Sequence, residues 1–174
     1  WKKLFKHADD HLDTSQLGQY LAAPDAASCV RSSIYKGESL HHYRLHRYCI
    51  MSNHVHLLIE PLPENVRSDF ELPDAQWPPL FYGEETREIV SGGKAPKELR
   101  WRALSGIMKS MKGASSRAIK KVTFVDGPVW KDESYDHWVR DAGEYLRIIN
   151  YIDMNPVKAG LCREPSEWVY SSAG

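Results

Sequence analysis

The sequence predicts a single α+β domain in which a short antiparallel sheet packs against helices. Three observations support this class: two β-forming runs between residues 43 and 59, a basic amphipathic helix over 97–121, and a second amphipathic helix over 142–155. A chain of 174 residues can bury one hydrophobic core, so we expect one domain over residues 1–174.

Composition restricts the classes of function. Lys and Arg balance Asp and Glu at 23 each, so any nucleic-acid surface must be local. The cysteines, Cys29, Cys49 and Cys162, are widely spaced without a zinc-binding pattern, which favours free thiols in a reducing cytosol. The sequence shows neither a long apolar run nor a signal-peptide pattern, so we expect a cytoplasmic protein without membrane contact.

The first forty residues are expected to form helical segments, interrupted at Pro24 and Gly37. One segment runs through Leu21. The next, from Asp25 to about Tyr35, carries apolar residues at helical spacing. These segments supply one helical layer ahead of the sheet.

An antiparallel hairpin follows. Residues 43–51 are β-formers, Ser52 and Asn53 form a turn, and residues 54–59 continue as a strand.

Two histidines, His54 and His56, lie in this second strand. Side chains alternate along a strand, so both imidazoles leave one face while Val55, Leu57 and Ile59 fill the other. Neutral imidazole is a good ligand for several divalent ions. The alternative is a pair of partly buried histidines that bond to backbone or water, but burying two imidazoles without partners is costly.

The identity of the metal depends on the remaining ligands. Zinc requires three or four protein ligands, and no Cys or carboxylate follows the histidines at a close, regular spacing. Mg²⁺ or Mn²⁺ is the better expectation if phosphate oxygens and waters complete the coordination shell.

An acidic segment separates the hairpin from the basic helix. It is rich in Pro, Gly and acids and has no periodicity, so we expect a loop insertion over 62–96.

The helix over 97–121 has an apolar stripe and, opposite it, a basic face. Its single acid is Glu98. Such a face can bind the phosphate backbone of DNA, whereas the simpler alternative is a solvated helix face. The candidate DNA-binding residues are Arg100, Arg102, Lys109, Lys112, Arg117, Lys120 and Lys121, preceded by Lys97.

The last third of the chain predicts a strand over 129–139 and a helix from Ala142 to Asn155, with Asp141 as its N-cap and Pro156 as its end. Tyr151 and Asn155 lie one turn apart on the flank of its apolar face. By itself this pair could be an amphipathic ring and an ordinary C-terminal residue. Beside a strand, a phenol and a carboxamide are placed to meet something docked on the sheet.

Taken together, these motifs resemble those of the REP-associated tyrosine transposases, which belong to the single-tyrosine HUH transposases, where HUH denotes His-hydrophobe-His. The resemblance covers most of the chain from about residue 40. It lies in the segment through MSNHVHLLIEP, in the Trp, Tyr-Asp and Arg-Asp pattern of residues 130–141, in YIDMNPVKAGL, and in the tail WVYSS.

The resemblance implies a ferredoxin-like antiparallel sheet with helices packed on one face. It implies that His54 and His56 bind a divalent metal, that Asn155 is the third ligand, and that Tyr151 is the nucleophile. The family begins with a strand that residues 1–5 match poorly, so we expect that strand to be missing or altered. The insertion over 62–96 is longer than the family pattern.

The implied activity is metal-dependent cutting and rejoining of single-stranded DNA at hairpin-forming repeats through a 5′-phosphotyrosine intermediate. The expected partner is single-stranded or hairpin DNA, bound by a monomer or a homodimer. Two alternatives remain open: a DNA-hairpin-binding protein without catalysis, and a zinc-dependent hydrolase that uses the histidines as ligands.

Overall fold

The computed structural model describes residues 19–64, 102–131 and 134–174. Residues 1–5, where the first strand of the family pattern is expected to be missing or altered, lie outside these ranges, as do Arg100 and nearly all of the insertion over 62–96. Among the described residues the helices are η1 (Gln19–Ala22), α2 (Pro24–Ser39), α4 (Leu104–Thr123), α5 (Ala142–Lys158) and η2 (Pro165–Glu167), and the strands are β1 (Tyr43–Ile50) and β2 (Val55–Pro61). The α+β class is confirmed.

Strands β1 and β2 form the predicted antiparallel hairpin, in which Ile50 pairs with Val55 and Cys49 pairs with His56. The Met51 amide closes the turn by donating to the His54 carbonyl at 2.9 Å. The register shifts between Leu45 and Arg47, which marks a β-bulge at His46.

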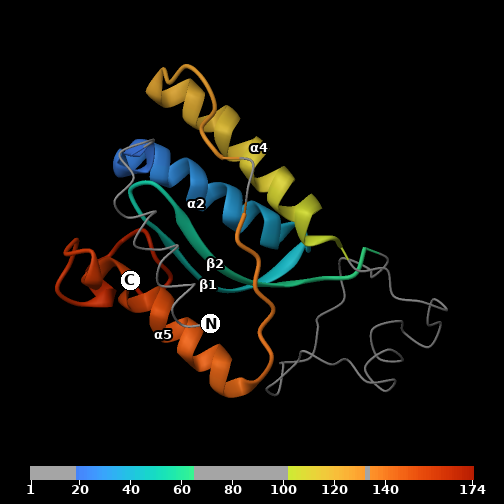
Figure 1. Cartoon of the computed structure of the whole chain (residues 1–174). Coiled ribbons are helices and arrows are strands. Elements are labelled where there is room, and N and C mark those ends of the chain that lie inside the picture. The colour runs from blue at the N-terminus through green and yellow to red at the C-terminus, as the bar shows by residue number, and fades with distance from the viewer. Residues whose placement is uncertain (1–18, 65–101, 132–133) are drawn as a thin grey trace.

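Helices cover both faces of this hairpin, so the expectation of helices on one face is wrong. Figure 1 shows α2 and α4 on one side and α5 on the other. The two hydrophobic clusters divide accordingly: Tyr48 and Ile50 pack with α2 and α4, whereas Cys49 and Met51 pack with α5. Alternating apolar residues give the hairpin two apolar faces, and each needs a cover.

Helix α2 begins with Pro24 and continues through Gly37 to Ser39, so the predicted interruption at Gly37 is wrong. The reason is packing. A Cβ on residue 37 would lie 2.5 Å from the Tyr43 hydroxyl, which donates to the Ile34 carbonyl at 2.6 Å. Gly37 therefore allows the helix to approach the first residue of β1.

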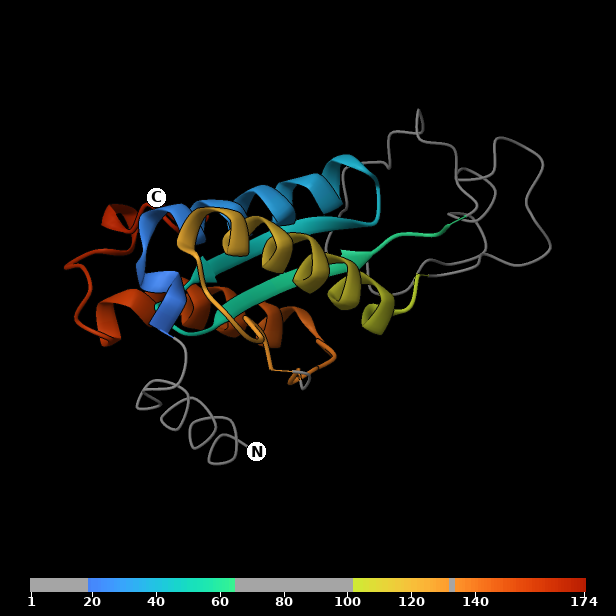
Figure 2. The ribbon, with the colours of Figure 1, turned by 90° about the horizontal axis from the view of Figure 1, so that it is seen from above.

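Helix α4 lies beside α2, as the view from above shows (Figure 2). It begins at Leu104 rather than at Lys97, and residues 97–101 lie outside the described ranges. Its buried face repeats every fourth residue, and the buried Ser115 in this face receives a hydrogen bond from the Trp130 indole at 3.0 Å. The four buried residues are Ile107, Met111, Ser115 and Ile119.

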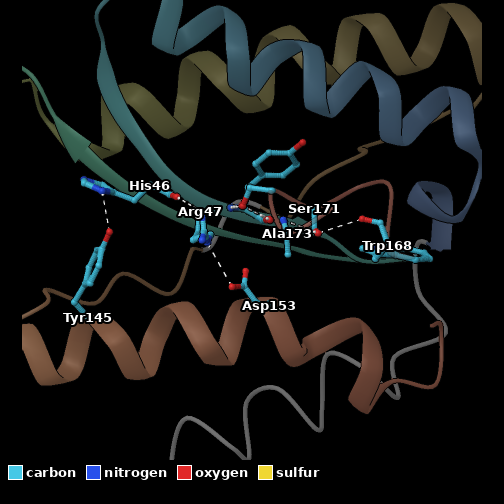
Figure 3. Close-up of polar contacts among 9 residues, drawn as sticks. His46, Arg47, Tyr145, Asp153, Trp168, Ser171 and Ala173 are labelled. Carbon is cyan, nitrogen blue, oxygen red and sulfur yellow. Dashed lines mark hydrogen bonds and ion pairs between the residues drawn. The ribbon is translucent and has the colours of Figure 1, made fainter. Parts of the chain in front are cut away.

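The predicted strand over 129–139 is wrong, because none of its described residues belongs to a strand. In the described structure the carboxy-terminal tail lies at the edge of β1 instead. Cys49 forms a β-bridge with Ser171, and the Ser172 amide donates to the Tyr48 carbonyl at 3.0 Å. Hydrogen-bonding groups of β1 are thereby satisfied by the tail, part of which appears in Figure 3.

Helix α5 begins as predicted, with the Asp141 carboxylate accepting from the Glu144 amide at 2.7 Å. It does not end before Pro156, which lies inside the helix, but runs on to Lys158. Proline disfavours rather than forbids a helical residue before it. Gly160 follows with a φ of 71°, a left-handed conformation that suits glycine at a helix end. Among the described helices, none has the length and apolar character needed to cross a membrane.

Candidate active site

The two histidines meet at the start of β2, as the alternation predicted. Their Nε2 atoms lie 3.0 Å apart, and the rings meet edge to face with centroids 4.7 Å apart. His54 is buried, with 8% of its surface exposed. Two ring nitrogens therefore converge on one point at the α5 side of the hairpin.

Asn53 contacts the far side of His54. The Asn53 Oδ1 lies 2.7 Å from His54 Nδ1. A carboxamide oxygen accepts hydrogen bonds and cannot donate them, so Nδ1 carries the proton. This contact was not anticipated, because residue 53 was interpreted only as part of the turn.

Burial keeps His56 uncharged. Desolvation, followed by the neighbouring His54, lowers the pKa of His56 from 6.5 to about 3. The side chain is thus neutral at physiological pH, which is the form that binds metal ions.

Tyr151 on α5 meets this histidine pair. Its ring lies edge-on to that of His56, with centroids 5.3 Å apart at an interplanar angle of 85°. The structure thus brings together two motifs that nearly a hundred residues separate in the sequence.

A cation accompanies the phenol. Lys158 Nζ lies 4.9 Å from the centroid of the Tyr151 ring, two helical turns along α5. The sequence reasoning assigned Lys158 no role. Its spacing of seven residues from Tyr151 on a helix is the signal that could have identified it.

Asn155 is buried on the same helix, with 4% of its surface exposed, and its Oδ1 has no hydrogen-bond partner. Buried carboxamide oxygens normally have a partner, so this oxygen is available to a ligand. Asn155 lies one helical turn after Tyr151, so the two residues are on the same flank of α5. In the described part of the chain, no group of three or more His, Cys, Asp or Glu residues is placed to hold a metal ion.

A second polar cluster lies on the same face of the hairpin. The Tyr145 hydroxyl lies 3.2 Å from His46 Nδ1 (Figure 3), and His46 Nε2 lies 3.3 Å from the Glu60 carboxylate. Arg44 is 3.7 Å from the same carboxylate. The sequence reasoning missed this cluster, although alternation along β2 places Glu60 on the face of His54 and His56.

The Arg47 guanidinium and the Asp153 carboxylate also connect β1 to α5, at 3.4 Å (Figure 3). The bulge at His46 explains why two consecutive residues of one strand both face the helix, since the extra residue resets the alternation. These contacts fix α5 along the hairpin and thereby fix Tyr151 beside His56.

The basic helix lies elsewhere. Helix α4 packs on α2, on the opposite face of the hairpin from α5. Lys109, Arg117, Lys120 and Lys121 are exposed on it, whereas the Lys112 amino group donates to the Lys131 carbonyl at 2.9 Å.

The last candidate of this group, Arg102, precedes α4 and lies 3.9 Å from Glu64. Those basic residues that the structure describes therefore do not converge with the histidines and Tyr151 on one face.

Similarity to known proteins points to transposases. The chain is 32% identical over 44 residues to the REP-associated tyrosine transposase of Escherichia coli, a match that covers 25% of this chain and 27% of the relative. It is 27% identical over 124 residues, 71% of this chain and 55% of the relative, to a Haemophilus influenzae protein provisionally named a REP-associated tyrosine transposase.

A further match, 29% identical over 115 residues, is an uncharacterised Haemophilus influenzae protein. The chain spans about half the length of these two Haemophilus influenzae relatives. No known protein-family model matches it. No solved structure matches it. Two of these three relatives thus carry the name of REP-associated tyrosine transposases.

Proposed function

We propose that this chain is a REP-associated tyrosine transposase that cuts and rejoins single-stranded DNA at hairpin-forming repeats. The observation that carries the proposal is the edge-on contact between Tyr151 and His56, at a centroid separation of 5.3 Å. A candidate nucleophile and a candidate metal site from distant parts of the chain thus form one site. The names of the relatives agree with this assignment.

The histidine pair fits a divalent cation. Two nitrogens that bind one ion at about 2.1 Å and at right angles lie about 3.0 Å apart, and the two Nε2 atoms are separated by 3.0 Å. The buried Asn155 Oδ1, which lacks a hydrogen-bond partner, suits the role of a third, oxygen ligand. A Mg²⁺ or Mn²⁺ ion, when bound, supplies positive charge that withdraws electrons from phosphate oxygens.

Tyr151 then acts as the nucleophile. Its phenolic oxygen forms a bond to phosphorus and loses its proton, while the bond from phosphorus to the 3′-oxygen breaks. The leaving 3′-oxygen takes up a proton and becomes a free hydroxyl. The product is a 5′-phosphotyrosyl enzyme.

The covalent step is reversible because one phosphate ester replaces another. A 3′-hydroxyl that attacks the phosphotyrosine reseals the strand and regenerates the Tyr151 phenol. One tyrosine can thus cut and join without an external source of energy. Lys158, whose ammonium lies 4.9 Å from the Tyr151 ring, is placed to offset negative charge that develops near the phenol.

The test is denaturing gel electrophoresis of the protein with end-labelled hairpin DNA and Mg²⁺ or Mn²⁺. Wild type is expected to give a labelled covalent band that Tyr151→Phe and His56→Ala abolish. Tyr135→Phe is the matched control, because this tyrosine is 76% exposed and lies outside α5.

The two alternative functions predict different results in these gel experiments. Hairpin binding in a native gel with no covalent band from any variant indicates a DNA-binding protein without catalysis. Zinc-dependent cleavage that survives Tyr151→Phe indicates a hydrolase. Either result overturns the proposal.

A further inference from the structure

We propose that Asn53 is a positioning residue that fixes the ring of His54 in the tautomer required for metal binding. This inference rests on the proposed function, since it assigns Asn53 a role at the same histidine pair.

The contact between Asn53 and His54 identifies the ring nitrogen of His54 that carries the proton. The Asn53 Oδ1 lies 2.7 Å from His54 Nδ1, and a carboxamide oxygen can only accept. A neutral imidazole has a single N–H, so the proton lies on Nδ1 and Nε2 keeps its lone pair. That lone pair is directed to the side where His56 Nε2 lies, 3.0 Å away.

The turn holds Asn53 in place from two sides. Before it, the Ser52 carbonyl accepts from the Leu21 amide of η1 at 3.1 Å. Around it, the Met51 amide donates to the His54 carbonyl at 2.9 Å. His54 itself is 8% exposed, which restricts rotation of its ring. The acceptor and the imidazole are therefore both held before any ligand arrives.

Loss of the acceptor at residue 53 is expected to weaken metal binding by His54. If residue 53 offers no acceptor, both tautomers of His54 become accessible, and the one with a proton on Nε2 cannot bind a cation through that atom. Loss of such an outer hydrogen-bond partner typically costs about 10-fold to 100-fold in metal affinity.

The experiment is a titration with Mn²⁺ alone, followed by calorimetry, of the wild type and three variants. Asn53→Ala is expected to weaken binding about 10-fold to 100-fold. Asn53→Asp keeps an accepting oxygen and is expected to bind at least as tightly as wild type. Asn150→Ala is the matched control, since Asn150 is exposed on α5 and is expected to bind like wild type.

The tautomer of His54 can also be measured directly in the wild-type protein. Long-range ¹H–¹⁵N NMR of the metal-free wild-type protein is expected to show His54 protonated at Nδ1. A proton on Nε2 overturns the inference even if Asn53→Ala fails to fold.

The possible failures are distinguishable. If wild type binds Mn²⁺ and folded Asn53→Ala binds it equally well, the positioning role is wrong while the proposed metal site stands. If folded wild type binds no Mn²⁺, the metal site of the proposed function fails, and the role of Asn53 fails with it.

Discussion

The ring of Tyr151 on α5 meets the ring of His56 on β2 at 85°, with their centroids 5.3 Å apart. Edge-to-face contact of this kind holds both rings in place. It makes the tyrosine part of the packing between helix and hairpin as well as a candidate nucleophile, and these two roles can be separated by substitution.

Tyr151→Phe keeps the ring and loses only the hydroxyl, so we expect it to lower the free energy of unfolding by no more than about 1 kcal/mol. Tyr151→Ala removes the ring and should cost about 2 kcal/mol or more. Urea denaturation of both variants measures this difference. Equal stability of the two variants would contradict the packing role of the ring.

His56 should make the metal-free protein sensitive to acid. Its pKa of about 3 in the folded protein lies below its ordinary value of 6.5. As the pH falls through 6.5, the unfolded chain binds a proton that the folded protein does not, so stability is full above 6.5 and decreases toward pH 3. Denaturation curves in the presence of a chelator, measured across this range, should show the decrease in wild type.

The matched variants are His56→Gln, which should lose this part of the pH dependence, and His41→Asn, which should keep it. His41 is exposed, and its φ of 52° suits asparagine. An unchanged pH dependence in His56→Gln would contradict the assignment of a low pKa to His56.

The ion pair between Arg47 and Asp153 should couple the hairpin to α5. Their side chains are 37% and 19% exposed, so solvent screens the pair in part. A double-mutant cycle with Arg47→Met and Asp153→Asn is expected to give a coupling energy of about 1 kcal/mol that decreases in high salt. Strict additivity of the two substitutions would show that the pair does not stabilise the contact between β1 and α5.

Gly37 should tolerate no side chain. Gly37→Ala places a Cβ 2.5 Å from the Tyr43 hydroxyl, inside a packed contact, and should cost about 1–3 kcal/mol. Gly106→Ala on α4 is the matched control, because apart from its chain neighbours and the nearby backbone of its own helix nothing lies within 4 Å of a Cβ there, and it should be neutral or stabilising by up to about 1 kcal/mol. Thermal unfolding compares them, and equal melting temperatures would contradict the close packing at Gly37.

Binding of the DNA backbone by the exposed basic residues of α4 stays a prediction. Replacing Lys120 and Lys121 with Gln should weaken binding of single-stranded DNA and reduce the slope of log K against log salt by about 0.7 per lost contact. Fluorescence anisotropy across a salt series measures this slope. Lys36→Gln on α2 is the control, and an equal loss per charge removed in both variants would indicate an effect of net charge rather than of a surface on α4.

Local features of this chain were predictable from sequence because neighbouring residues encode them. The period of two places His56, on β2, and His54, directly before it, on one face of the hairpin whatever packs against it. Asp141 caps α5 because its carboxylate reaches an amide three residues later. The Ser52 and Asn53 turn follows from its residue types and from the β-formers on both sides.

The strand predicted over 129–139 from its local residue types does not form. A strand forms only if another backbone offers its hydrogen-bonding groups, and at β1 the tail bonds to Cys49 and Tyr48 instead. Similarly, a local rule predicted that α5 ends at Asn155, before Pro156, but the helix continues for three more residues to Lys158.

The sequence by itself determined the α+β class, the hairpin with its paired imidazoles, and the flank of α5 that carries Tyr151 and Asn155. Only the tertiary structure decided that α5 covers the hairpin face opposite α2 and α4, and that Tyr151 meets His56. The bulge at His46 contributes to this arrangement by turning both His46 and Arg47 toward α5. Periodicity fixes the face on which a residue lies, whereas the pairing of faces depends on packing among segments far apart in the chain.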